Sequence, residues 1–152
     1  MRLNTITENH ITEIIRMENN SETSEFIIPY SEEKYRTEIV NPNNHYAGIY
    51  EKGKLLGFFI LGIEQEGKRI EFRRIVIEHK GFGHGQKAVT ELEQYCKALW
   101  NTGSIWLDVF AHNHRGIHIY EKLGYVKTGE STYNGRQLII MEKYLTNDNQ
   151  KL

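Results

Sequence analysis

Three strand-like runs follow one another in the first half of the sequence, and very short breaks separate them. The runs span residues 45–51, 54–64 and 68–78, with Gly53 and Gly67 at the breaks. Breaks this short join neighbouring antiparallel strands, whereas parallel strands need a long crossover. The chain therefore builds an antiparallel sheet first, which excludes a dinucleotide-binding fold that opens with parallel β-α-β units.

The hydrophobic period then changes from that of a strand to that of a helix. After Gly85, apolar residues recur at the spacing of an amphipathic helix, which ends at residues 101–103. The other predicted elements are helices at 11–18, after Ser31 and from Asn113 to Gly124, and strands at 104–110, 125–130 and 137–143. The predicted fold class is α+β, with a mixed, mostly antiparallel sheet of about six to seven strands flanked by helices.

Length and charge indicate an ordinary globular protein. The chain has 152 residues and a formal net charge of −1, with no dense basic run, so nucleic-acid or membrane binding is not expected. We expect one domain over 1–145 and a loose tail at 146–152. Cys96 is the only cysteine, and no signal-peptide or membrane-spanning pattern is seen, so we expect a cytoplasmic protein.

The sequence HKGFGHGQKAV, residues 79–89, places three glycines between a strand and a helix. The first N–H groups of a helix and the positive end of its dipole bind anions, and glycine lets a phosphate approach them closely. No GK[ST] follows, so this is not a Walker A loop. We predict a pyrophosphate site made by Lys80, Phe82, Gly83, His84, Gly85, Gln86 and Lys87; the alternative is a tight turn without a ligand.

A second motif follows the strand at 104–110. Together the two motifs resemble the GCN5-related N-acetyltransferase (GNAT) family, which carries Arg/Gln-x-x-Gly-x-Gly/Ala after its fourth strand and Asn-x-x-Ala-x-x-x-Tyr-x-x-x-Gly-Phe after its fifth. This sequence reads Lys80-x-x-Gly83-x-Gly85 and then Asn113-x-x-Gly116-x-x-x-Tyr120-x-x-x-Gly124-Tyr125. It departs from the family pattern at three positions, which are Lys80, Gly116 and Tyr125.

The resemblance implies a GNAT fold in which the fourth and fifth strands splay apart and acetyl-CoA inserts between them. The fourth strand would pair with the pantetheine amides, Asn113 would contact the pantetheine arm, and Lys122 would reach the adenosine end. Beyond the glycine loop, the residues implied in acetyl-CoA binding are Ile75, Val76, Ile77, Asn113, Gly116, Ile119 and Lys122.

The resemblance also implies the reaction, which is direct transfer of the acetyl group to a primary amine of a small molecule or peptide. Tyr120 would protonate the leaving thiolate, or its ring would only pack beside the cosubstrate. An N–H near Ile75 or Val76 would hold the oxyanion. No covalent enzyme intermediate is needed, and Cys96 falls on the apolar face of the long helix, where we expect a buried thiol.

The base that removes the proton from the amine has two candidates. Asp108 matches the position of a catalytic glutamate in ribosomal-protein N-acetyltransferases of this fold; the alternative is a carboxylate that is merely satisfied by its surroundings beside the splayed strands. Glu71 is the rival, expected on a strand face shared with Arg73, Ile75 and Ile77. Its simpler interpretation is a surface ion pair with Arg73.

Other functions and ligands remain as alternatives. The histidines at 112, 114 and 118 lack a metal-binding pattern, so no metal is expected. Four glutamates before the sheet, Glu22, Glu25, Glu32 and Glu33, favour a cationic amine acceptor. The alternative to an enzyme is a non-catalytic acyl-CoA-binding module with a sensor or assembly role. The resemblance also implies a possible homodimer, but nothing in the sequence indicates which surface would form it.

Overall fold

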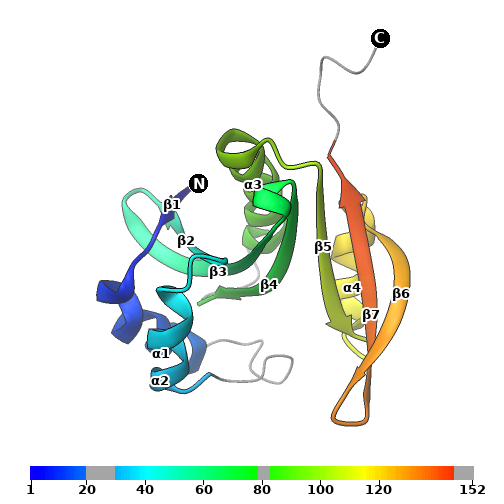
Figure 1. The fold of residues 1–152 in the computed structure, drawn as a ribbon, viewed down its shortest axis with the longest axis horizontal. Helices are drawn as coiled ribbons and strands as arrows, with labels where there is room; N and C mark the ends of the chain where they lie inside the picture. Colours follow the sequence, from blue (N-terminus) through cyan, green and yellow to red (C-terminus); the bar gives the residue numbers. More distant parts are fainter. Residues whose placement is uncertain (20–29, 79–82, 146–152) are drawn as a thin grey trace.

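The computed structural model describes residues 1–19, 30–78 and 83–145, so the predicted tail at 146–152 lies outside them. Its strands form one seven-stranded sheet in the order β1-β2-β3-β4-β5-β7-β6 (Figure 1). The strands are β1 (Arg2–Thr5), β2 (Asn44–Glu51), β3 (Lys54–Glu64), β4 (Arg69–Ile77), β5 (Ser104–Phe110), β6 (Val126–Tyr133) and β7 (Arg136–Tyr144). The α-helices are α1 (Ile11–Asn19), α2 (Glu32–Ile39), α3 (His84–Trp100) and α4 (His114–Lys122). The predicted α+β class is confirmed.

Turn chemistry sets the hairpins where the sequence predicts them. Lys52 and Gly53 both have positive φ angles, 51° and 78°, in the turn between β2 and β3. Asn134 and Gly135, with φ of 50° and 78°, repeat this conformation between β6 and β7. Such turns match the twist of the two strands they join.

Strand β1 is an element that the sequence did not predict. Its four residues carry one apolar side chain, Leu3, which gives no detectable alternation. The strand forms because it pairs with the edge of β2, from Arg2 opposite Tyr50 to Thr5 opposite Ala47. With β1 in place, the strand that precedes the glycine loop is the fourth of the sheet.

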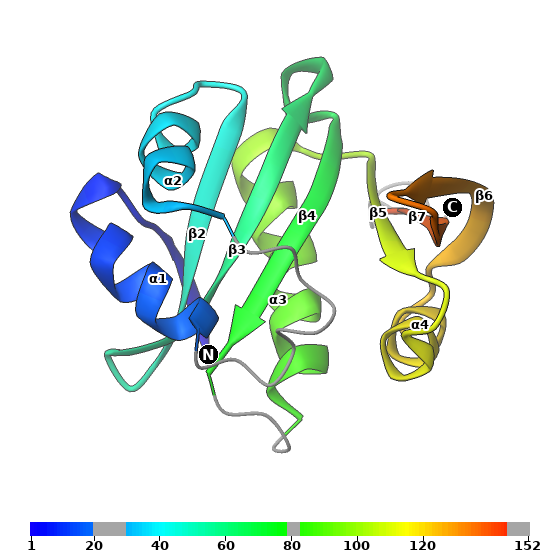
Figure 2. The ribbon, with the colours of Figure 1, turned by 90° about the horizontal axis from the view of Figure 1, so that it is seen from below.

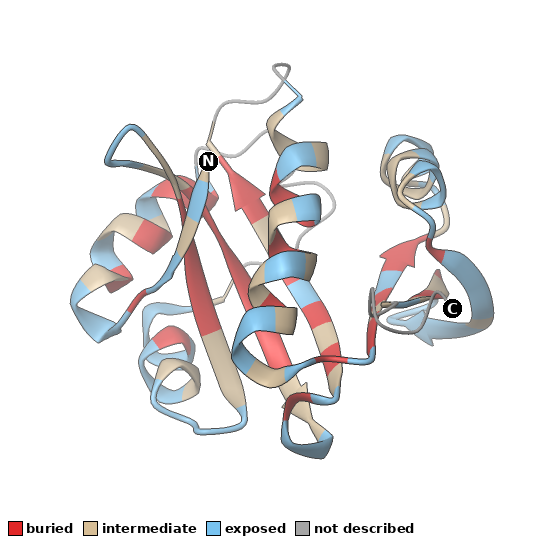
Figure 3. Cartoon of the chain, turned by 90° about the horizontal axis from the view of Figure 1, so that it is seen from above, coloured by how far each residue is buried: buried red, intermediate tan, exposed pale blue. Residues whose placement is uncertain are grey.

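Helices cover both faces of the sheet and bury two separate apolar cores (Figure 3). Helix α3 packs on one face through Ala88, Leu92 and Cys96, and α4 adds partly buried side chains to the same core. Helices α1 and α2 pack on the other face, where Met17 and Tyr35 are fully buried. In the described residues, no helix is long and apolar enough to cross a membrane.

The two halves of the sheet separate at β4 and β5. These strands are parallel, and in the described residues their pairing is limited to three positions, from Arg69 opposite Ser104 to Glu71 opposite Trp106. Figure 2 shows β5, β6, β7 and α4 diverging from β1–β4. The expected splayed strands are therefore present, and β4 continues beyond this fork to Ile77 paired only with β3.

Candidate active site

A β-bulge in β4 determines on which face of the sheet each β4 side chain lies near the fork. Phe72 pairs with Leu61 and Arg74 pairs with Ile60, which leaves Arg73 as the extra residue. Phe72 packs in the core beneath α3, and after the bulge Ile75 does the same. The bulge therefore shifts the alternation by one residue within a single strand.

The predicted position of Glu71 is wrong in one respect. Glu71 alternates with Ile70 and Phe72, which belong to the core on the α3 side, so its side chain lies on the face that α1 and α2 cover. Ile75 and Ile77 face the α3 side, so Glu71 does not share their face. The consecutive charges of Arg73 and Arg74 inside an alternating strand were the available sign of this bulge.

Both bulge arginines are held by ion pairs on the α1 and α2 face. Arg73 donates through Nε to Glu71 at 2.8 Å and through Nη1 to Asn44 at 2.5 Å. The expected pairing of Glu71 with Arg73 is thus present. Arg74 donates to the buried carboxylate of Glu18 at 2.7 Å, and the Tyr35 hydroxyl donates to the same Glu18 oxygen.

Asp108 lies on β5 just beyond the fork. Its neighbours Leu107 and Val109 point into the core on the α3 side, so Asp108 lies on the opposite face, as Glu71 does. It is two residues past Trp106, the last β5 residue paired with β4. Although Asp108 is exposed to solvent, the protein around its carboxyl desolvates it, and this raises the pKa above the ordinary 3.8.

Tyr120 reaches across the fork from the other face. Its ring lies 5.8 Å from that of Phe72 on β4 and 6.0 Å from that of Tyr125, centroid to centroid. Burial raises the pKa of Tyr120 to about 12, so the phenol keeps its proton at neutral pH. Helix α4 therefore places the ring of a protonated tyrosine next to β4, the strand that precedes the glycine loop.

The start of α3 fits a phosphate group. Gly83 has a φ of 71° and precedes the helix, and a Cβ added at Gly85 would meet no atom of the described residues within 4 Å. Packing within the protein therefore does not explain Gly85, whereas a ligand close to the first helical turn does. The N–H of Lys87, however, donates to the Gly83 carbonyl at 3.2 Å, so this N–H is not available to an anion.

Of the other residues predicted to bind the pyrophosphate, the structure describes some and not others. Lys80 and Phe82 lie outside the described residues. His84 and Gln86 belong to the first turn of α3 and are partly buried, and the side chain of Lys87 is exposed there. Their predicted contacts with acetyl-CoA stay predictions.

Replacing Gly85 with alanine should separate stability from cosubstrate binding. Alanine favours the helix by up to about 1 kcal/mol, so the free energy of unfolding should stay equal or rise. The added methyl group should weaken CoA binding about tenfold, the cost of one lost charge-assisted hydrogen bond of about 1.5 kcal/mol. Calorimetric titration and urea unfolding would measure both.

Gly129→Ala is the matched control, because a Cβ there would meet only Ile140, at 3.7 Å. Its affinity for CoA should equal that of the wild type. Unchanged CoA affinity in Gly85→Ala would contradict the assignment of the phosphate site.

The start of α4 is built by a side-chain cap. Asn113 accepts a hydrogen bond from the N–H of Gly116 at 3.0 Å, which caps the helix that the sequence predicts to begin there. A Cβ on Gly116 would lie 2.6 Å from Nδ2 of Asn113, so glycine makes room for this cap. Further along α4, Ile119 is partly buried and Lys122 is exposed.

Cys96 is buried in the core, as predicted, and burial raises the pKa of its thiol to about 12. A neutral, inaccessible thiol is a poor nucleophile. We expect iodoacetamide to leave the native protein unmodified and fully active, and to label one thiol after urea unfolding. Mass spectrometry would check this, and rapid labelling of the native protein with loss of activity would contradict it.

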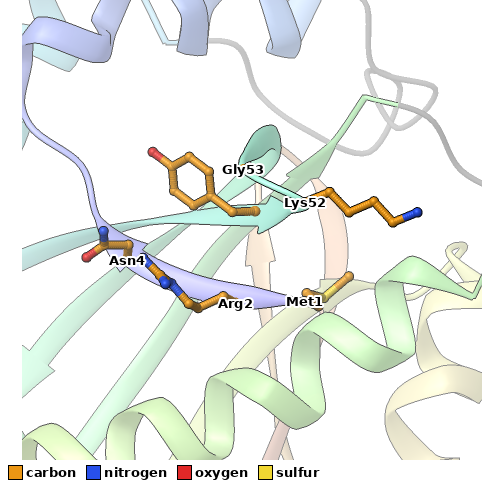
Figure 4. Close-up of a pocket in the computed structure, with 6 residues that line it drawn as sticks. Met1, Arg2, Asn4, Lys52 and Gly53 are labelled. Carbon is orange, nitrogen blue, oxygen red and sulfur yellow. The ribbon is translucent and has the colours of Figure 1, made fainter.

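One pocket of the structure does not belong to this site. An open pocket lies beside β1 and the turn after β2 (Figure 4), and it is lined by Met1, Arg2, Asn4, Tyr50, Lys52 and Gly53. None of the predicted site residues lines it.

In the parts of the chain that the structure describes, no three histidine, cysteine, aspartate or glutamate side chains are grouped so that they could hold a metal ion.

The forked sheet, the glycines at the start of α3 and Tyr120 on α4 are the features that the resemblance to the GNAT family implied. The sequence pattern of the Acetyltransferase (GNAT) family matches residues 12–125, and the chain belongs to this family. It is an enzyme that transfers an acetyl group from acetyl-CoA to an amine.

A curated relative and two solved structures are similar to this chain in sequence or in fold. The chain is 28% identical to a spermine/spermidine N(1)-acetyltransferase from Bacillus subtilis over 109 residues, which cover 64% of this chain and 72% of that protein. Among solved structures, the Vibrio cholerae spermidine N-acetyltransferase in complex with CoA and spermine has a TM-score of 0.77 at 23% identity, covering 93% and 94% of the two chains. The Escherichia coli ribosomal-protein-S18-alanine N-acetyltransferase has a TM-score of 0.79 at 18% identity, covering 99% and 97%.

Proposed function

We propose that the protein acetylates a primary amine of a polyamine, with Asp108 as the base and Tyr120 as the acid. The observation that carries this proposal is the placement of the two groups on opposite faces of the fork, an exposed carboxylate on one and a protonated phenol on the other. The Bacillus subtilis relative named for spermine and spermidine supports the acceptor class.

The chain supplies three binding elements for acetyl-CoA. The first turn of α3 holds the pyrophosphate through backbone N–H groups. The edge of β4 beyond Glu71 has no partner strand on the β5 side in the described residues, so its backbone is available to the amides of the pantetheine arm. An N–H at Ile75 or Val76 stabilises the oxyanion.

The reaction needs two proton transfers, one from the amine to a base and one from an acid to the thiolate. A polyamine arrives as an ammonium ion with a pKa of ~10.4 if it resembles lysine, so a base must remove a proton before the nitrogen attacks. Asp108 fits this role better than Glu71, because the Glu71 carboxylate already accepts a hydrogen bond from Arg73. Tyr120 holds the proton that the departing thiolate takes.

Acidic groups on the acceptor side support a cationic substrate. Asp108 is an exposed carboxylate on the face of the sheet that α1 and α2 cover, and Glu32 and Glu33 are exposed at the start of α2. The other two glutamates of the sequence prediction, Glu22 and Glu25, lie outside the described residues. We further propose a cytoplasmic location, which the single buried cysteine supports.

Thiol release from acetyl-CoA tests the acceptor class. Spermine and spermidine should give a kcat/KM about tenfold above that of hexylamine, because one further charged contact contributes about 1.5 kcal/mol. An N-terminal alanine peptide serves as the second comparison. Turnover restricted to the peptide would replace the polyamine by a protein α-amine, and tight acetyl-CoA binding without any turnover would favour the non-catalytic module.

A further inference from the structure

The position of Tyr120 depends on contacts that cross the fork. Tyr120 belongs to α4, which is part of the half of the molecule built from β5, β6 and β7. In the described residues, only three strand pairs join this half to β4. They run from Arg69 opposite Ser104 to Glu71 opposite Trp106. Side chains must therefore fix where the phenol of Tyr120 lies relative to β4.

One set of side chains ties the base of the fork on the α1 and α2 face. Arg69 of β4 pairs with Glu64 at 3.0 Å and with Glu142 of β7 at 3.3 Å. Its guanidinium also lies 4.9 Å from the ring centroid of Trp106 on β5. These contacts lie on the face opposite to Tyr120, so they hold the strands together without orienting the phenol.

Glu93 ties the two halves on the side where Tyr120 lies. It projects from α3, and its carboxylate accepts a hydrogen bond from the Tyr125 hydroxyl at 3.1 Å and from Lys143 Nζ at 2.9 Å. Tyr125 follows α4 and Lys143 is on β7, so one carboxylate joins α3 to both of these elements. The Glu93 side chain is 15% exposed and Tyr125 is 1% exposed, so water screens this contact only weakly.

Tyr125 contacts Tyr120 directly. Its N–H donates to the Tyr120 carbonyl at 2.9 Å, and the two rings are 6.0 Å apart. The family pattern has phenylalanine at position 125, so the hydroxyl that reaches Glu93 is a departure in this sequence. The exchange of phenylalanine for tyrosine, which is conservative in size and ring shape, thus adds a polar contact across the fork.

We propose that Glu93 is a positioning residue that fixes the phenol of Tyr120 by holding Tyr125 and Lys143 against α3. This inference rests on the proposed role of Tyr120 as the acid. It also links the two ends of the acetyl-CoA site, because the helix whose first turn faces the pyrophosphate is the helix that holds the acid in place.

A double-mutant cycle tests the coupling. Glu93→Gln and Tyr125→Phe should each lower kcat about threefold to tenfold, the effect of one hydrogen bond, with KM for acetyl-CoA unchanged. In the Tyr120→Phe background the same substitutions should change kcat less than about twofold, because the group they position is gone. Tyr125→Phe keeps the ring and leaves Glu93 paired with Lys143, so it stays folded if Glu93→Gln does not.

Glu91→Gln, on the same helix, is the control and should match the wild type in both backgrounds. Equal losses of kcat with and without the Tyr120 hydroxyl would overturn the positioning role while leaving the acid assignment intact. No loss in either background would also overturn it. If Tyr120→Phe alone keeps full activity, the acid assignment itself fails and this proposal fails with it.

Discussion

Tyr120→Phe should lower kcat by about a hundredfold and leave KM for acetyl-CoA close to that of the wild type. A general acid contributes about 10²–10⁴ in rate, and a thiolate is already a fair leaving group, so the lower end is expected. Phenylalanine keeps the ring contacts with Phe72 and Tyr125, so the loss should isolate the hydroxyl. Steady-state thiol release with saturating acceptor would measure it.

The pH dependence gives this prediction a second readout. The pKa of Tyr120 is raised to about 12, so the phenol stays protonated and no loss of kcat from its ionisation is expected up to pH ~10. Tyr144→Phe is the control, because that side chain is on β7, is 73% exposed and has no assigned role in the site. Full activity of Tyr120→Phe would show that the ring only packs beside the cosubstrate.

The order of the elements could be predicted because its signals are local. Turn residues at Gly53 and Gly135, the cap at Asn113 and the helical period after Gly85 each act within a few residues of the chain. Strand β1 escaped prediction for the opposite reason, since its four residues form a strand only against the edge of β2.

The sequence supplied candidate residues for the site but not their arrangement. The second motif contained Tyr120 and the strand before it contained Asp108, yet the point where β4 and β5 part is a property of the whole sheet and not of either strand. The bulge was signalled by Arg73 and Arg74, two charges that interrupt an alternating strand. Glu93 gave no signal, because its partner Tyr125 is 32 residues further along the chain.

Asp108→Asn should lower kcat by about 10²–10³ at neutral pH and change the pH profile, because the amide cannot accept the proton of the ammonium. The pKa of Asp108 is raised above 3.8, and the base works only when it is ionised. Wild-type kcat should therefore fall as the pH is lowered through this raised value and should be level above it.

In Asp108→Asn only the fraction of acceptor that has already lost its proton can react. That fraction grows about tenfold per pH unit below the amine pKa of ~10.4, so kcat of the variant should rise with pH and approach the wild type in alkaline solution. Glu71→Gln is the discriminating comparison, since the Glu71 carboxylate is held by Arg73 and has no place in this scheme. If Glu71→Gln shows the alkaline recovery and Asp108→Asn does not, the base is Glu71. If neither shows it, the amine loses its proton to solvent before it binds, and the raised pKa of Asp108 reflects only its desolvation beside the separating strands.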